Sequence, residues 1–124
     1  MFSQNLTVGE YVILHILEGL KHKKKTSRIL SIVSYRAREG RVKKSPGHWL
    51  DYLAAHAWVR EDYADALDAL VTRGLIKAEN KRTKNEYKTY YSITPEGVKL
   101  REENYQTMYT SAVALIVTEP VALI

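Results

Sequence analysis

The chain has 124 residues, which is enough for one compact domain with an ordinary hydrophobic core and too few for two. It contains no cysteine, which excludes disulfide bonds and thiolate metal sites and leads us to expect a reducing compartment, the cytoplasm. Its net charge is +5, but residues 21–44 hold ten Lys or Arg against one acid, Glu39, so the remainder is net −4. This concentration of charge predicts a surface for a polyanion, with a solvated lysine-rich loop as the alternative.

Four helices are predicted in the first part of the chain, at residues 7–20, 26–38, 46–57 and 60–73. Thr7 and Glu10 have the spacing of a capping box before the first apolar periodic stretch. Gly40 is expected to end the second helix, and Pro46 is suited to the first position of the third. Gly74 is expected to stop the fourth helix.

A hairpin and a last helix are predicted in the second part. After Gly74 the apolar period changes from helical to two, so residues 75–79 and 87–94 are expected to be antiparallel strands. The charged segment 80–88 forms the tip. Thr94 and Pro95 then have the residue types of a helix cap and a first helical turn. Nothing in residues 98–118 strongly breaks helical geometry, so this last helix is expected to be long.

The junction between the fourth helix, the hairpin and the last helix carries a resemblance. Its residues occur in a fixed order over about half of the chain: Leu67, Leu70, Gly74, Leu75 and Ile76, then Tyr91, Ile93, Thr94, Pro95 and Gly97. In these residues the chain resembles the winged helix-turn-helix regulators, especially the PadR-like and MarR-like groups and the small winged-helix proteins of archaea and their viruses. The resemblance implies an α+β, mostly helical fold with a two-stranded wing and a long C-terminal helix. Residues 1–97 would be the DNA-binding unit and residues 98–124 a dimerisation helix and tail of the same domain.

The resemblance also implies a recognition helix at 60–73, a supporting helix at 46–57 and a wing tip at 80–88. Together with the basic segment, it predicts contacts to double-stranded DNA from these residues: Lys23, Lys24, Lys25, Arg28, Arg36, Arg38, Arg41, Lys43, Lys44, Arg60, Lys81, Arg82, Lys84, Lys88 and Tyr90. If the basic loop and the stretch 35–44 lie on the side of the wing, they would form one continuous phosphate-binding rim.

The expected recognition helix is unusual because residues 60–73 carry four acids against two arginines. A carboxylate can accept from a cytosine amino group, but four acids exceed what base readout usually employs. We therefore expect shallow engagement through Arg60 and Tyr63, with the wing and the basic loop supplying the affinity. The alternative is a protein partner that binds this acidic helix.

The last helix predicts a homodimer. Its apolar residues follow an alternating spacing of three and four, and the expected interface residues are Val98, Tyr105, Met108, Ala112 and Leu115. The alternative is that the helix folds back onto the first helix of its own domain. A dimer would place two wings symmetrically on inverted half-sites.

An enzyme is not predicted. The four histidines lack metal-binding spacing, and the chain has neither a glycine-rich phosphate loop nor a nucleophile elbow, so no catalytic residue, metal or cofactor is expected. The apolar stretch 111–124 is too short to span a bilayer and is interrupted by Glu119 and Pro120. We expect a cytoplasmic, nucleoid-associated transcriptional regulator that binds specific DNA sequences as a homodimer. The alternatives are an architectural, replication or plasmid-partition protein, and a winged-helix protein-interaction module.

Overall fold

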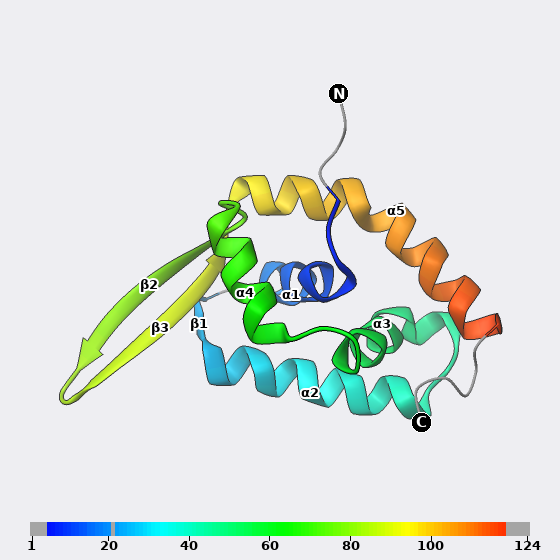
Figure 1. The fold of residues 1–124 in the computed structure, drawn as a ribbon, viewed down its shortest axis with the longest axis horizontal. Coiled ribbons are helices and arrows are strands. Elements are labelled where there is room, and N and C mark those ends of the chain that lie inside the picture. Colours follow the sequence, from blue (N-terminus) through cyan, green and yellow to red (C-terminus); the bar gives the residue numbers. More distant parts are fainter. Residues whose placement is uncertain (1–4, 21, 119–124) are drawn as a thin grey trace.

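The computed structural model describes residues 5–20 and 22–118 of the chain. The fold is α+β and mostly helical, with a small antiparallel sheet (Figure 1). Its elements in chain order are α1 (Val8–Glu18), β1 (Lys24–Lys25), α2 (Thr26–Val42), a 3-10 turn η1 (Pro46–His48), α3 (Trp49–Trp58), α4 (Tyr63–Thr72), β2 (Ile76–Thr83), β3 (Glu86–Ile93) and α5 (Pro95–Thr118).

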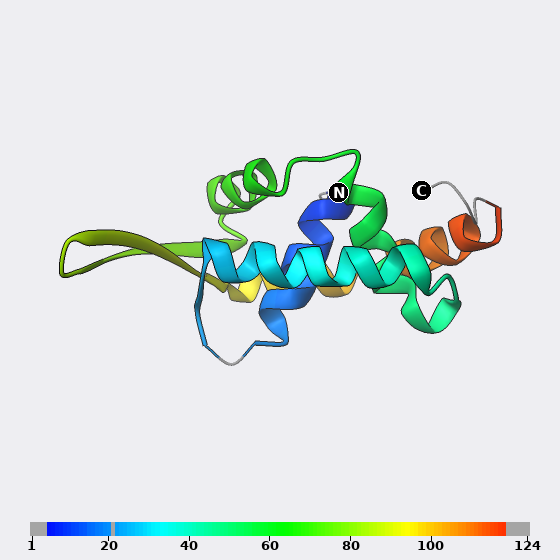
Figure 2. The same cartoon turned by 90° about the horizontal axis from the view of Figure 1, so that it is seen from below.

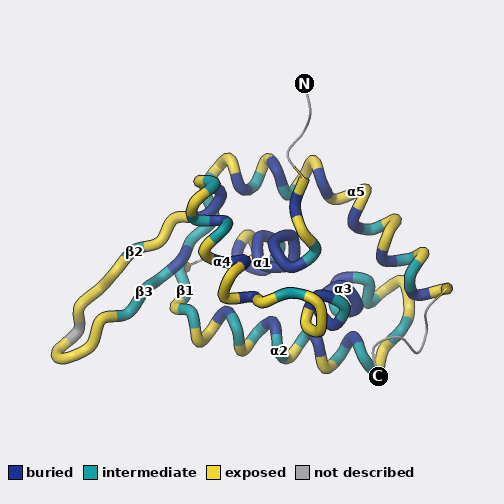
Figure 3. The backbone as a smooth tube through the Cα atoms, viewed as in Figure 1, coloured by how far each residue is buried: buried dark blue, intermediate teal, exposed yellow. Residues whose placement is uncertain are grey.

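Helix α1 forms the centre of the core, with the other helices around it (Figures 1 and 3). The predicted capping box is present: the Thr7 hydroxyl accepts from the Glu10 N–H at 3.1 Å, and the Glu10 carboxylate accepts from the Thr7 N–H at 2.9 Å. Tyr11, Val12, Ile13 and Leu14 are all completely buried. Four consecutive buried residues mean that α1 is covered on every side, which an apolar periodic stretch alone does not require.

Helix α2 continues to Val42, so the prediction that Gly40 ends it is wrong. Gly40 instead allows α2 and α3 to approach closely, because a Cβ placed on it would lie 2.0 Å from the Asp51 carbonyl oxygen. The helix ends where the Lys43 N–H donates to the Glu39 carbonyl at 2.8 Å. A glycine in a helix therefore marked a helix crossing here and not a helix terminus.

Helices α3 and α4 differ from their predicted bounds at their N-termini. Pro46 begins a 3-10 turn, and the α-helix starts at Trp49. Helix α4 starts at Tyr63 because Asp62 is its N-cap and accepts from the N–H groups of Ala64 and Asp65. Its predicted stop is confirmed, since Gly74 has a φ of +73°, a conformation that glycine adopts without strain.

The sheet is larger than predicted and has the strand order β1-β3-β2. The ladder between β2 and β3 runs from Ile76 opposite Ile93 to Thr83 opposite Glu86, so the tip predicted at 80–88 is mostly paired strand. Only Lys84, with a φ of 51°, and Asn85 close the turn. The hairpin projects well beyond the helices (Figures 1 and 2). Strand β1 was not predicted, and it places Lys24 opposite Tyr91 and Lys25 opposite Tyr90.

Helix α5 packs along α1 and α3 of its own chain, which was the alternative to a dimer interface. Met108 and Ala112 are 7% and 0% exposed inside this core, so the expectation that they face a second chain is wrong. Leu115 and Val98 are partly buried, and the Leu115 carbonyl accepts from the Tyr52 hydroxyl at 3.4 Å. Only Tyr105 of the five expected interface residues is exposed, at 42%. The apolar stripe of α5 is thus largely used within one chain.

The start of α5 is as expected, since the Thr94 hydroxyl accepts from the Gly97 N–H at 3.1 Å. None of the helices within residues 5–20 and 22–118 combines the length and apolar character needed to cross a membrane.

Candidate nucleic-acid interface

The two faces of the hairpin differ in charge. Cross-strand partners point to the same side of a sheet, and side chains alternate between its sides. The register therefore places four lysines on one side, together with Tyr90, Ser92, Glu79 and Glu86, and the ion pair of Lys23 with Glu79 adds a fifth. We call this side the lysine face; its lysines are Lys23, Lys25, Lys77, Lys81 and Lys88. With two acids against five lysines, its net charge is +3.

Two lysines of this face, Lys81 and Lys88, stand directly opposite each other in the ladder. Like charges in this position destabilise a strand pair. Glu86 lies 3.4 Å from the Lys88 ammonium, whereas the Lys81 ammonium lies over the Tyr90 ring at 5.7 Å and forms no ion pair with any described residue. The pair is therefore only partly compensated within the chain.

The loop before α2 joins the same face through an ion pair. Lys23 donates to the Glu79 carboxylate, a hydrogen bond that raises the pKa of Lys23 and lowers that of Glu79. Lys25, two residues later, lies opposite Tyr90 and makes no ion pair with the described part of the chain. Two basic regions far apart in the sequence thus meet on one surface, and the short strand β1 brings them together.

A notch lies beside this face, at the start of α2. Strand β1 pairs only with Tyr90 and Tyr91, so the edge of β3 before them is left open. A cavity of about 330 Å³ occupies this place, and its lining residues are Lys25, Thr26, Ser27, Tyr87, Lys88 and Thr89. The N-cap of α2, Lys25, provides no side-chain cap, and the first turn of the helix contains no acid. Helix N–H groups without these partners, beside two ammonium groups, are favourable for a phosphate oxygen.

The remaining predicted hairpin contacts fall elsewhere. Arg82 lies on the opposite side of the hairpin, where its guanidinium covers the Tyr87 ring at 5.5 Å. Lys84 is in the turn, and Lys24 shares the side of Tyr91 that faces the core. Arg28 is exposed in the first turn of α2, close to the notch in sequence. The predicted set of wing cations is therefore divided between two faces and the tip.

The other half of the basic segment lies at the far end of α2. This helix has 17 residues and is therefore about 25 Å long. Its end away from the hairpin carries four predicted contacts: Arg38, Arg41, Lys43 and Lys44 (Figure 1). Glu39 pairs with Lys43 at 2.7 Å, which lowers the pKa of this carboxyl group and raises that of the lysine. The continuous rim considered from the sequence is not formed, because α2 separates its two halves.

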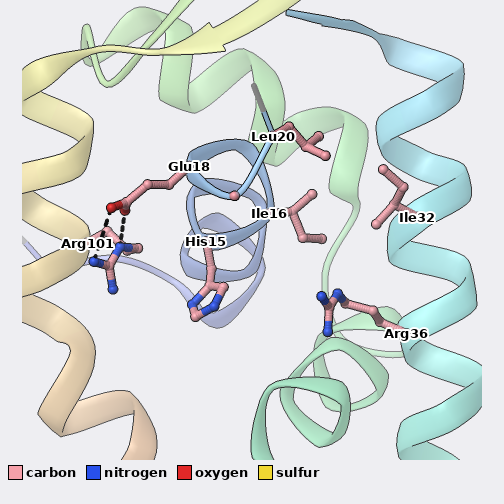
Figure 4. A pocket seen from close by; sticks show the side chains of 8 residues that line it. His15, Ile16, Glu18, Leu20, Ile32, Arg36 and Arg101 are labelled. Atoms are coloured by element: carbon pink, nitrogen blue, oxygen red, sulfur yellow. Dashed lines mark hydrogen bonds and ion pairs between the residues drawn. The ribbon is translucent and has the colours of Figure 1, made fainter. Parts of the chain in front are cut away.

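Arg36 points toward a hollow at the side of the molecule and stays partly exposed. Figure 4 shows it beside a hollow between α1, α2 and α5, with His15 and Arg101 nearby. Its guanidinium donates to the Asp51 carboxylate at 3.0 Å. Across the hollow, which measures about 430 Å³, Arg101 pairs with Glu18. Arg36 is thus placed away from the lysine face, where its charge is matched by Asp51.

The acidic segment before the hairpin has a structural use for two of its acids. The Glu61 carboxylate accepts from the Gly9 N–H at 3.1 and 3.2 Å, at the N-terminus of α1. Asp62 caps α4, as described above. Asp65 and Asp68 remain exposed on the surface of α4.

The expected engagement through the start of this helix is partly wrong. Tyr63 is 5% exposed, and its hydroxyl donates to the Ala54 carbonyl at 3.1 Å inside the core. Burial of this phenol raises its pKa. Arg60 lies in the turn before α4, where it donates to the His56 carbonyl at 3.2 Å. An intercalated or groove-bound Tyr63 is incompatible with this packing.

Lys77 belongs to the lysine face but was not among the predicted contacts. Lys77, Glu79 and Lys81 alternate along a strand, but the sequence prediction limits the DNA contacts of the hairpin to its tip and Tyr90. Ser27 and Thr89 were missed because nothing local indicates that α2 begins beside β3. Among the described residues no group of three or more His, Asp or Glu side chains is arranged to hold a metal ion.

Comparisons with protein-family profiles, with curated proteins and with solved structures return no match to this chain. The functional assignment therefore depends on the geometry and charge of the chain itself.

Proposed function

We propose that this protein binds double-stranded DNA as a winged-helix protein, with the lysine face and the notch holding the phosphate backbone. The observation that carries the proposal is the cross-strand pair of Lys81 and Lys88, flanked by Lys25, on a hairpin that projects from the body. Such a pair costs stability in the free protein, and a bound polyanion removes that cost. The order of helix, hairpin and long helix supports the winged-helix assignment.

Binding by this surface would be driven mainly by release of counterions from the DNA. Lysine ammonium groups contact phosphates as point charges and carry no sequence information of their own. The exposed side chains of α4 include Asp65 and Asp68, which would repel the backbone if the helix entered the major groove fully. The arrangement therefore favours backbone contact over base readout.

Regulation of transcription by occupying DNA is the first biological role we propose, and an architectural, replication or partition role is the second. The second is favoured by the predominance of phosphate-binding groups, because a protein that reads only the backbone coats DNA. A homodimer through α5 stays a prediction; the exposed Tyr105 stacks on Tyr109 and meets Trp49 edge-on, with ring centroids 6.2 and 5.6 Å apart.

The test compares two double variants that lose the same charge, one on the hairpin and one at the far end of α2. Lys81→Ala with Lys88→Ala alters the lysine face, and Arg38→Ala with Arg41→Ala is the matched control. Fluorescence anisotropy of a labelled random duplex is measured over a series of salt concentrations. We expect the first pair to reduce the slope of log K against log salt by about 1.8, at about 0.9 per lost phosphate contact, and the control to change it little. Equal slopes for the two pairs, or no salt-dependent binding by the wild type, would reject the proposal.

A further inference from the structure

The turn between α3 and α4 forms a groove that none of the described residues fills. Its volume is about 590 Å³, within the range of small binding pockets, and its apolar walls are Leu30, Trp58, Val59 and Tyr63. Trp58 is 40% and Val59 59% exposed, whereas Tyr63 is buried beneath them. Two large apolar side chains side by side at the surface, beside a cavity, are typical of an interaction site.

The groove is acidic at its rim. Glu61 and Asp62 belong to its lining, and each accepts from backbone N–H groups. Arg60 is also in the lining, but it donates to the His56 carbonyl in the same turn. Asp65 and Asp68 follow on the exposed surface of α4. The occupant that fits this groove has an aromatic or aliphatic group next to a cation.

The outer end of the hairpin provides this combination, on the side opposite the lysine face. Tyr87 is 73% exposed, and Arg82 lies over its ring with 5.5 Å between the guanidinium carbon and the ring centroid. The two residues are cross-strand partners and are followed by Lys84 in the turn. Tyrosine and arginine are among the residues that contribute most to protein interfaces when they enter a pocket. The hairpin extends beyond the helices, so this end is sterically free to reach another molecule (Figure 2).

We propose that the hairpin tip of one chain docks into the α3–α4 groove of a second copy. Tyr87 packs against Trp58 and Val59, and Arg82 lies toward Glu61 and Asp62. The contact joins two different surfaces, so it is heterologous and propagates into rows of molecules instead of closing into a dimer. The lysine face remains free, because it is on the other side of the hairpin from Arg82 and Tyr87, and only Tyr87 is shared with the notch.

The strength of this contact is set by its small size. A hairpin tip in one groove buries less surface than a stable protein–protein interface, so association in free solution is weak. Chains held on a common polyanion have a raised effective concentration, and the same contact then produces cooperative binding. The interface itself does not depend on the proposed DNA binding and is tested without nucleic acid.

Cross-linking is the direct test, and the absence of native cysteine makes it specific. Lys84→Cys places a thiol beside the tip and Val59→Cys places one at the groove. The two variants are mixed at equal concentration with a short bis-maleimide, and the heterodimeric product is identified by mass. The matched control uses Val42→Cys in place of Val59→Cys. Val42 is 78% exposed and lies at the far end of α2.

We expect the groove pair to give at least about five times as much cross-linked product as the control pair. Adding Arg82→Ala and Tyr87→Ala to the tip variant should remove this difference, because truncating the main contact residues of an interface abolishes most of its binding energy. Equal yields for the two pairs would overturn the proposal.

Sedimentation velocity provides a second measurement on chains without cysteine. The wild type should show a sedimentation coefficient that rises continuously with concentration, and Arg82→Ala with Tyr87→Ala should abolish the rise. Val59→Asp should act in the same way, whereas Val42→Asp should behave as the wild type. A rise that is insensitive to Arg82 and Tyr87, or no growth beyond a closed dimer at any concentration, would reject the head-to-tail contact. Because no DNA is present, either result leaves the proposed DNA binding to its own test.

Discussion

Helix α4 and the hairpin follow each other in the chain, and both are rich in charged residues, yet their charges have different uses. Glu61 and Asp62, just before α4, bind the N–H groups at the starts of α1 and α4. On the hairpin, Lys81 and Lys88 oppose each other across the ladder, and Lys81 has no ion-pair partner among the described residues. The acids stabilise the fold, while the like-charge pair of lysines destabilises the hairpin.

This difference has a physical origin in the two kinds of secondary structure. A helix leaves unpaired N–H groups at its N-terminus, which nearby carboxylates satisfy. A hairpin satisfies its inner backbone groups within the ladder and offers no such use for a lysine. The net charge of residues 60–73 therefore counts two carboxylates that are bound to backbone N–H groups. The net charge of the lysine face counts ammonium groups that have no such backbone partner within the described ranges.

The largest effect that tests this comparison is on stability. Asp62→Ala removes the N-cap of α4 and should lower the free energy of unfolding by about 1 kcal/mol, within the usual range of about 0.5–2 for such caps. Lys81→Ala with Lys88→Ala should be neutral or slightly stabilising because it removes a like-charge pair. Urea denaturation measures both. Asp68→Asn, exposed and not a cap, is the control for α4, and a cap variant as stable as this control would contradict the structural role of Asp62.

A smaller effect is expected on DNA affinity. Glu79 lies within the lysine face and pairs with Lys23, so Glu79→Gln should release that ammonium and raise affinity at low salt by about two- to fivefold, the range of an exposed ion pair. Asp65→Asn on α4 should raise it less. Anisotropy titrations would compare both with Glu102→Gln, an exposed site on α5. If Asp65→Asn had the larger effect, α4 would be the element nearer to the duplex.

The smallest expected effect is a pH dependence of stability that comes from the core and not from the hairpin. Burial lowers the pKa of His15, and the positive charges of Arg101 and Arg36 add to the shift. The unfolded chain therefore binds a proton at His15 more tightly than the folded chain does. As a result, the free energy of unfolding decreases when the pH falls below the unfolded pKa of about 6.5 and recovers when the pH rises to that value. Thermal unfolding at about pH 5 and about pH 7.5 should show this loss, and His15→Gln should reduce it.

The lysine-face variants do not alter the surroundings of His15, so they should leave the pH dependence of stability unchanged. A pH dependence that persisted fully in His15→Gln would assign it to other groups.

Local signals predicted much of the fold. The capping box at Thr7, the left-handed Gly74 and the cap at Thr94 were all read from neighbouring residues, and all three are present. The hairpin was also predicted, although its strands are longer, because a charged ladder of lysine and asparagine resembles a loop when read by apolar alternation alone. Features that depend on two or three neighbouring residues were therefore the ones predicted correctly.

Long-range contacts account for the errors. Local sequence predicts a helix stop at Gly40, but its lack of a side chain is required by Asp51 on the next helix. The stripe of Met108 and Ala112 was assigned to a partner, but α1 and α3 cover it. An apolar stripe on a helix indicates only that it is buried against another element. Which element buries it depends on the folded structure.

By itself the sequence determined the types of the elements, their caps and the excess of positive charge, because these follow from periodicity, from turn chemistry and from composition. Only the tertiary structure decided which charges act together. Strand β1 joins Lys23 and Lys25 to the hairpin, while α2 carries Arg38 and Arg41 about 20–24 Å away. The physical reason is that packing decides which charged residues lie next to each other in a sheet and which are separated by the length of a helix. A count of charges along the chain contains no information on these distances.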